Sequence, residues 1–301
     1  MLCCYINLAE RTDRRHHLEQ SFIENTPPHW QLKRIEAIDA ALVRDRGVKG
    51  RLRDAEKACF LSHSFTLGIH RDFQAPILIL EDDAKFGPLS CLAIEAAVAR
   101  AEQLGPWDIL FTDLITPLPQ TMAKLAELRS GWQGLGPPEL LDLKSLCFAG
   151  STAYVVHPRA IDRLFDALNS LDELNTPYDL LLRRLIHQGS LRAWAAFPFP
   201  TTVRPHLQGS SIQMASDERA NVAWDSFRRL MWLHTSEEDA SLDAELIAQH
   251  FKISLGDHLN GVLQAVSGIP IIPTRGNRIF PTHHRQGGND GSGSDRPTQE
   301  F

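Results

Sequence analysis

Three consecutive acids, Glu81, Asp82 and Asp83, follow an apolar run whose length suits one buried β-strand. Side chains alternate along an extended segment, so Glu81 and Asp83 should share one side of it unless the chain turns there. Neighbouring carboxylates repel one another, and ionising all three near a core requires a counter-charge. Mg²⁺ or Mn²⁺ could supply it, because hard cations bind one or two carboxylates together with phosphate oxygens. Alternatively, the acids simply solvate the end of a strand and a turn.

Basic residues gather at the start of the first expected helix, where Arg11, Arg14 and Arg15 surround Asp13. Cations oppose the dipole of a helix N-terminus, at a cost of about a few tenths of a kcal/mol each. A bound anion would reverse that effect, since a helix N-terminus with arginines is a natural phosphate site. For Arg11 a phosphate contact and a solvated helix face are both open, whereas a solvated helix face is the simpler explanation for Arg15.

Strand-like and helix-like segments alternate from the start of the chain, which is typical of a mainly parallel α/β sheet covered by helices. We expect strands at 2–7, 32–37, 77–80, 109–112, 151–156 and 191–196, and helices at 13–24, 54–70, 90–104, 122–129, 158–168 and 177–187. Ligands of open α/β sheets bind beyond the carboxyl ends of the strands, which is where the three acids lie.

The pattern changes to helices after residue 205, with helices expected at 218–234 and 237–251. Ser236 and Asp239 form a capping-box pattern at the start of the second helix. We therefore predict a catalytic domain at 1–205, a helical appendage at 206–282 and a disordered, glycine-rich polar tail at 283–301.

The composition excludes several classes of protein. The chain has 301 residues, 43% of them hydrophobic and 23% charged, which is ordinary for a soluble globular protein. No apolar run approaches the roughly 20 residues that span a bilayer, and the N-terminus lacks the basic start of a signal peptide. A net charge of -6 weighs against a nucleic-acid binder. The five cysteines are odd in number and show no CxxC spacing, so we expect reduced, cytoplasmic thiols.

Several segments together resemble glycosyltransferase family 25, which includes bacterial lipooligosaccharide galactosyltransferases and animal collagen galactosyltransferases. The matching segments occur in the family's order and cover about residues 2–205; they are "INLAERTDRR" (6–15), "RIEAIDA" (34–40), "EKACFLSH" (56–63), "LILEDDA" (78–84), "WDILFTDL" (107–114), "GSTAYVVHPRA" (150–160) and "PYD" (177–179). One departure is "AEKACF", where the family has a "GEIGC" type of segment.

The resemblance implies a Rossmann-like nucleotide-sugar-binding domain of the type called GT-A, with a divalent metal, Mn²⁺ or Mg²⁺, and a UDP-sugar donor. It implies an inverting transfer of a hexose, typically galactose, to a glycan acceptor of lipooligosaccharide, lipopolysaccharide or another surface glycan. Asp83 would be the leading metal ligand, with Asp82 and Glu81 contacting metal or ribose. The residues implied in donor binding are Asn7, Arg11, Arg14, His63, Glu81, Gly150 and Ser151.

An inverting transfer needs a carboxylate that takes the proton of the acceptor hydroxyl. Asp179 and Asp113 are the two acids in family-matching segments that could serve, and we prefer Asp179 slightly. Structural alternatives exist for these residues and their neighbours. Asp179 could close a capping box begun by Thr176, with Pro177 at the first helical position. His63 could be a hydrogen-bonded core histidine, and the segment around Gly150 an ordinary tight turn.

Other functions remain to be weighed against this one. A homologue could bind nucleotide sugar or glycan without turnover, and "AEKACF" is the feature that favours it. A metal-dependent phosphotransferase is disfavoured, because the haloacid-dehalogenase pattern places its acids after the first strand. The sequence lacks the G-x-G-x-x-G motif of dinucleotide-dependent dehydrogenases and the G-x-S-x-G motif of serine hydrolases, which disfavours both functions.

A lipid-linked acceptor would place the enzyme at the inner face of the cytoplasmic membrane. The helix with Trp224, Phe227 and Trp232 has the aromatic and basic mixture of an interfacial helix, so we expect peripheral membrane association there. Packing of that aromatic stripe against the catalytic domain is the commoner explanation. No feature indicates an oligomeric state.

Overall fold

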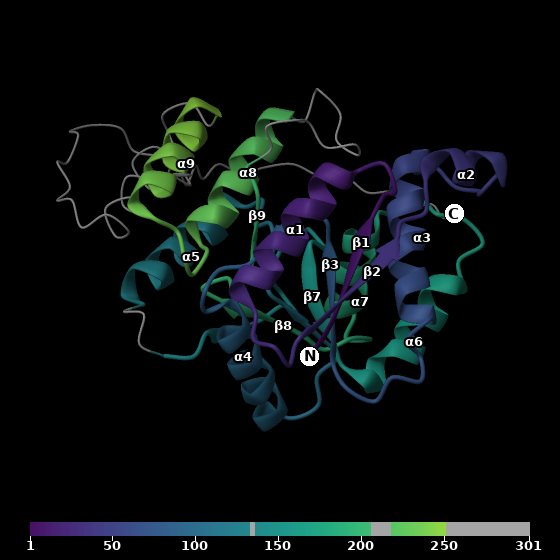
Figure 1. Cartoon of the computed structure of the whole chain (residues 1–301), viewed down its shortest axis with the longest axis horizontal. Helices are drawn as coiled ribbons and strands as arrows, with labels where there is room; N and C mark the ends of the chain where they lie inside the picture. The colour runs from purple at the N-terminus through teal and green to yellow at the C-terminus, as the bar shows by residue number, and fades with distance from the viewer. Residues whose placement is uncertain (133–135, 206–217, 251–301) are drawn as a thin grey trace, which may run out of the picture. The chain divides into compact units, whose positions relative to one another are not determined.

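The computed structural model describes residues 1–132, 136–205 and 218–250 (Figure 1). All of these belong to one compact unit, which spans Met1–Ile271. The expected tail at 283–301 lies outside the described residues, and the domain boundary after residue 205 remains a prediction.

A seven-stranded sheet forms the centre of this unit, in the order β2-β1-β3-β7-β5-β8-β6. Its strands are β1 (Leu2–Asn7), β2 (Gln31–Glu36), β3 (Ile77–Glu81), β5 (Ile109–Phe111), β6 (Glu139–Asp142), β7 (Ala153–Val156) and β8 (Ala193–Phe197). β1 pairs in parallel with β2 and β3, and β5 with β8, whereas β7 and β6 pair antiparallel to their neighbours. Five of the seven strands therefore run in one direction, and the expected mainly parallel α/β sheet is confirmed.

Helices cover both faces of the sheet. They are α1 (Thr12–Asn25), α2 (Ala40–Asp45), α3 (Asp54–Gly68), α4 (Ser90–Leu104), α5 (Pro119–Gly131), α6 (Pro158–Asn169), α7 (Tyr178–His187), α8 (Glu218–Leu230) and α9 (Glu237–His250). Because successive strand side chains point to opposite faces, Cys3 and Tyr5 pack with buried residues of α1 and α4. Cys4 and Ile6 belong instead to the larger core, which includes residues of α3, α6 and α7.

The chain turns directly after β3, and this turn changes the placement of the acids. Glu81 ends the strand, Asp82 and Asp83 form the turn, and the short strand β4 (Ala84–Lys85) follows. β4 pairs antiparallel with β9 (Thr202–Val203) in a separate two-stranded sheet. The segment near residue 203 is thereby held beside the acidic turn.

Helices α8 and α9 pack against one another and follow the sheet in the sequence (Figure 1). Phe227 and Trp232 are buried, which confirms the packing explanation for these two aromatic residues. Arg229 is also buried and forms an ion pair with Asp243 of α9. Phe227, Trp232 and Arg229, on which the interfacial-helix hypothesis partly depended, are therefore buried inside the protein. Among the helices of the described ranges, none is both long and apolar enough to cross a bilayer.

Candidate active site

Glu81 connects three elements at the carboxyl end of β3. Its backbone N–H donates to the carbonyl of Thr152 at 2.7 Å, and its Oε1 accepts from the Ser151 hydroxyl at 2.8 Å. Nε2 of His63, on α3, lies 3.5 Å from the same Oε1. Burial opposes ionisation of this carboxyl, but the His63 and Ser151 contacts outweigh burial, so the pKa of Glu81 is lowered. The carboxylate form is thus held in place from two sides.

Asp82 is bound by residues from the end of β1 and from α1. Its Oδ2 accepts from the Asn7 side-chain amide at 2.9 Å, and its Oδ1 accepts from Arg14 at 2.9 Å. Asn7 in turn accepts from the Arg34 guanidinium at 3.0 Å, which fixes the orientation of the amide. Arg14 therefore binds Asp82 in this structure. Arg11 forms an ion pair with Asp13 at 2.9 Å. Asp13 offsets the local positive charge at this helix start.

Asp83 has the most perturbed carboxyl of the three acids. Burial raises its pKa to about 7, and the charges of Glu81 and Asp82 add to this, while Arg14 and Arg228 act in the opposite direction. The nearest oxygen of Asp83 lies 3.8 Å from Arg14. Burial thus makes the charged form of Asp83 costly, and a divalent cation would stabilise that form. The donor set, two neighbouring carboxylates on a turn, fits a hard cation.

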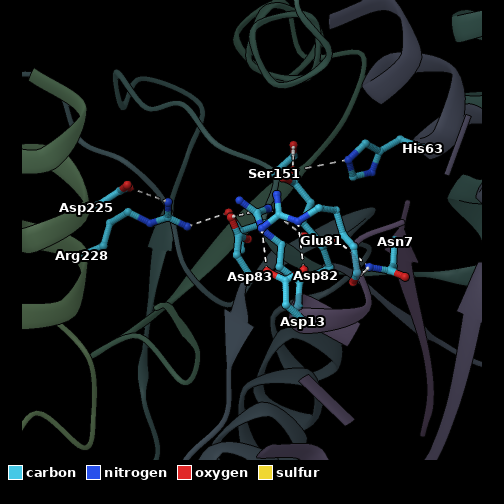
Figure 2. Close-up of polar contacts among 12 residues, drawn as sticks. Asn7, Asp13, His63, Glu81, Asp82, Asp83, Ser151, Asp225 and Arg228 are labelled. Carbon is cyan, nitrogen blue, oxygen red and sulfur yellow. Dashed lines mark hydrogen bonds and ion pairs between the residues drawn. The ribbon is translucent and has the colours of Figure 1, made fainter. Parts of the chain in front are cut away.

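A buried arginine approaches the acids from the opposite side. Figure 2 shows Arg228 and Asp225 of α8 on one flank of the acidic turn, and His63 and Asn7 on the other. Arg228 donates to Asp113 after β5 and to the Thr152 hydroxyl, and it pairs with Asp225 at 3.1 Å. Burial raises the pKa of Asp113, and the Arg228 pair offsets only part of that rise. Asp113 is 1% exposed, so an acceptor hydroxyl would have no direct path to it in this arrangement.

Asp179 occupies a different position, at the start of α7. Its Oδ2 accepts from the backbone N–H of Gly150 at 2.8 Å, across two segments that are distant in sequence. Gly150 has a φ of 93°, a conformation that favours glycine. Pro177 is the residue that precedes the helix, and no side-chain cap bond is formed there, so the capping-box alternative is wrong. Asp179 is half-buried and therefore more accessible than Asp113.

His63 lies in an aromatic cluster, on the face of α3 that packs against the core. Its ring stacks on Tyr178 with a centroid distance of 4.4 Å, and its Nδ1 lies 2.9 Å from the Tyr154 hydroxyl. The two tyrosine hydroxyl oxygens are 2.8 Å apart. His63 thus combines a packed ring with an edge that faces Glu81.

A cavity of about 300 Å³ opens where β1, β2 and β3 end, against α3. Five residues expected in the site line it, namely Arg11, Arg14, His63, Glu81 and Asp82. Ser151 is connected to the cavity through its hydrogen bond to Glu81, and its chain neighbour Gly150 donates to Asp179. Cys59, which was not among the expected site residues, also lines the cavity. Cys59 lies four residues before His63 on the same helix, so the two share a helix face. This spacing could have identified Cys59 as a site residue from the sequence.

Residues 3–182 match the model of glycosyltransferase family 25, described as a lipopolysaccharide biosynthesis protein family. The chain belongs to glycosyltransferase family 25. The expected family is thereby confirmed. The matched segment of this family 25 protein ends within α7, so Arg228 lies beyond it.

Comparison with solved structures gives a weaker relationship for this family 25 protein. The crystal structure of mouse xyloside xylosyltransferase 1 in its apo form is 13% identical, with a TM-score of 0.30. That alignment covers 64% of this chain and 63% of the mouse protein, which is less than two thirds of the latter's length. No curated protein matches the chain.

Proposed function

We propose that this family 25 glycosyltransferase transfers a hexose, with galactose the first candidate, from a UDP-sugar to a glycan of the lipopolysaccharide or lipooligosaccharide class. The transfer would invert the anomeric centre and depend on Mn²⁺ or Mg²⁺. The observation that carries the proposal is the acidic turn beside the cavity, where burial and neighbouring carboxylates raise the pKa of Asp83 to about 7.

We propose that the site residues divide into donor contacts and metal contacts. Arg11 and Arg14 line the cavity and would donate to the diphosphate, and Arg14 has further N–H groups besides the one on Asp82. Asn7 orients Asp82, and Ser151 orients Glu81. Asp83 and Asp82 would hold the hard cation, which when bound would stabilise the charge of the leaving diphosphate.

Asp179 is the residue we propose as base. It would accept the proton of the acceptor hydroxyl as that oxygen forms a bond to the anomeric carbon and the bond to the diphosphate breaks. The Gly150 N–H holds one of its oxygens at 2.8 Å and leaves the other to reach the acceptor. The buried Asp113 is the second candidate, and its pairing with Arg228 makes it the less suitable one.

Thermal unfolding of the wild type with Mn²⁺ alone, UDP alone and both together tests the site directly. A ligand at about 100 times its dissociation constant stabilises the native state by about 2.7 kcal/mol, so a joint site predicts a larger shift with both than with either. Asp83→Asn should lose this synergy, whereas Asp72→Asn, at an exposed acid after α3, should keep it. A wild type indifferent to both ligands would contradict a metal–diphosphate site and leave a glycan-binding homologue without turnover as the alternative.

The donor and acceptor are tested by turnover. UDP release with a panel of UDP-hexoses and truncated lipooligosaccharides should be greatest with UDP-galactose and should require the acceptor. We further propose that the enzyme acts at the inner face of the cytoplasmic membrane on a lipid-linked acceptor. Cosedimentation with acceptor-containing vesicles, and its absence with plain vesicles, is the expected result.

A further inference from the structure

A second group of potential ligands lies on the α3 side of the cavity. Cys59, His63 and Glu81 each offer one atom, and these three atoms lie within 4.8 Å of one another. Cys59 and His63 are one helical turn apart on α3, while Glu81 comes from the end of β3. The arrangement therefore depends on helix-to-sheet packing and not on a local loop. All three residues line the cavity.

The Nε2 atom of His63 points into this group. The atom is buried and forms no hydrogen bond with any residue of the described ranges, and its nearest acid oxygen, on Glu81, is 3.5 Å away. The other ring nitrogen is bonded to Tyr154, and the ring face is stacked on Tyr178. A bound cation would meet the lone pair of Nε2 in the tautomer whose Nδ1–H donates to Tyr154, whereas without a cation an Nε2–H can face the Glu81 carboxylate. Metal-ligating histidines are held in this way, by a hydrogen bond from the nitrogen that does not bind the metal.

The chemistry of the three atoms differs from that of the acidic turn. A thiolate, an imidazole and a carboxylate are the ligands that Zn²⁺ accepts in tetrahedral sites, whereas Mg²⁺ and Mn²⁺ prefer oxygen. One thiolate and one carboxylate also balance the charge of a divalent ion in a half-buried place. Three protein ligands would leave a fourth position for water or a ligand, and all three residues line the cavity.

We propose that Cys59, His63 and Glu81 form a binding site for a thiophilic divalent cation such as Zn²⁺ or Co²⁺, separate from the hard-cation site at Asp82 and Asp83. Binding releases the thiol proton of Cys59 to solvent and forms the metal–sulfur bond. If the cavity binds the donor as proposed above, an ion at this site occupies part of it, and Zn²⁺ should compete with UDP. The metal site itself does not depend on that function.

Titration of the purified, metal-free full chain with Co²⁺ provides the test, because a cobalt–thiolate bond has a charge-transfer absorption in the near ultraviolet. We expect this band to saturate at one equivalent of Co²⁺ and to be displaced by Zn²⁺ but not by Mg²⁺. Cys59→Ser should abolish the band. Cys147→Ser, which alters another half-buried cysteine, should keep it, and so should Asp83→Asn. No band in the wild type, or its persistence in Cys59→Ser, would overturn the proposal.

A second measurement keeps the test decisive if Cys59→Ser does not fold. Alkylation of the wild type, mapped by mass spectrometry, should be slowed by Zn²⁺ at Cys59 at least tenfold more than at Cys147. Equal protection of both cysteines would contradict the site. Both readouts are independent of turnover, so a protein without transferase activity could still bind Co²⁺, and the two proposals fail separately.

Discussion

Arg228 of α8 donates a hydrogen bond to the carboxylate of Asp113, although the two residues are 115 positions apart in the sequence. They are 3% and 1% exposed, and the same guanidinium reaches Thr152 at 2.8 Å. Its charge also lowers the pKa of Asp83, against the larger effect of burial. A helix beyond the family-matched segment thus provides the buried cation next to the acidic turn. The C-terminal helices are part of the site's electrostatics.

Replacing Arg228 should lower the free energy of unfolding substantially. Arg228→Met leaves Asp113 buried without its partner, and breaking a buried pair from one side destabilises a protein by about 3–5 kcal/mol. Urea denaturation should show this loss, and Asp113→Leu combined with Arg228→Met should recover much of it. Arg71→Met is the matched control, because Arg71 and Asp162 form an exposed pair whose attraction is screened by solvent. Equal effects of the two arginine variants would contradict the structural role.

The stability of the metal-free protein should depend on pH through Asp83. Its native pKa is raised to about 7 from 3.8, so between these values the native state binds more protons than the unfolded state. The free energy of unfolding therefore falls as pH rises through this window, by at most about 1.4 kcal/mol per pH unit. Asp83→Asn should remove this part of the pH dependence and gain stability relative to the wild type as pH rises from about 4 to about 7. Parallel stability curves for the two proteins would show that the pKa is not raised.

Asp179→Asn should remove the proposed base and leave the structure around it unchanged. The asparagine oxygen can still accept from the Gly150 N–H, but it cannot take a proton, so transfer should fall by about 10²–10⁴. The melting temperature and the UDP affinity should stay near those of the wild type. Asp172→Asn, at an exposed acid before α7, is the control and should leave turnover unchanged. Transfer by Asp179→Asn at the wild-type rate would remove Asp179 as the base.

The support for the His63 ring can be tested by two similar substitutions. Tyr154→Phe deletes the hydroxyl that bonds Nδ1, and loss of such an outer hydrogen bond weakens metal affinity by about 10–100-fold. Tyr178→Phe retains the stacked ring and the Tyr154 hydroxyl, so Co²⁺ affinity should change less. A Co²⁺ titration of both variants compares them. If Tyr178→Phe weakens binding more than Tyr154→Phe, the ring is oriented by other means.

The longer elements were predictable because they carry clear periodicity. The predicted helix at 90–104 matches α4, and the strand at 2–7 matches β1. The short elements α2, β4, β6 and β9 were missed, since two to six residues give too little pattern for a reliable assignment. β4 and β9 form because they pair with each other, from positions about 120 residues apart, which no local signal encodes.

Only part of the candidate site was expected from the sequence: neither Arg228 nor Cys59 was named, and none of the pairings was. The acids and the arginines were named from their places after strands and at a helix start. That Arg14 binds Asp82 depends on how α1 packs on the sheet, and that Arg228 reaches Asp113 depends on the path of a distant helix. Periodicity reports which side of an element is buried, whereas such pairs are decided by tertiary packing.

The antiparallel strand β7 also has a consequence for synthesis of the chain. β3 and β5 each bond to β7 and not to each other, and β7 is made from later residues than both. A growing polypeptide can therefore pair β1, β2 and β3 early, while β5 waits for β7 and β8 to leave the ribosome. Until Ala153–Val156 emerge, the inner edge of β3 is an unpaired, largely apolar strand of the kind that recruits other chains. Translational pausing before this strand should favour aggregation, and pausing after it should not.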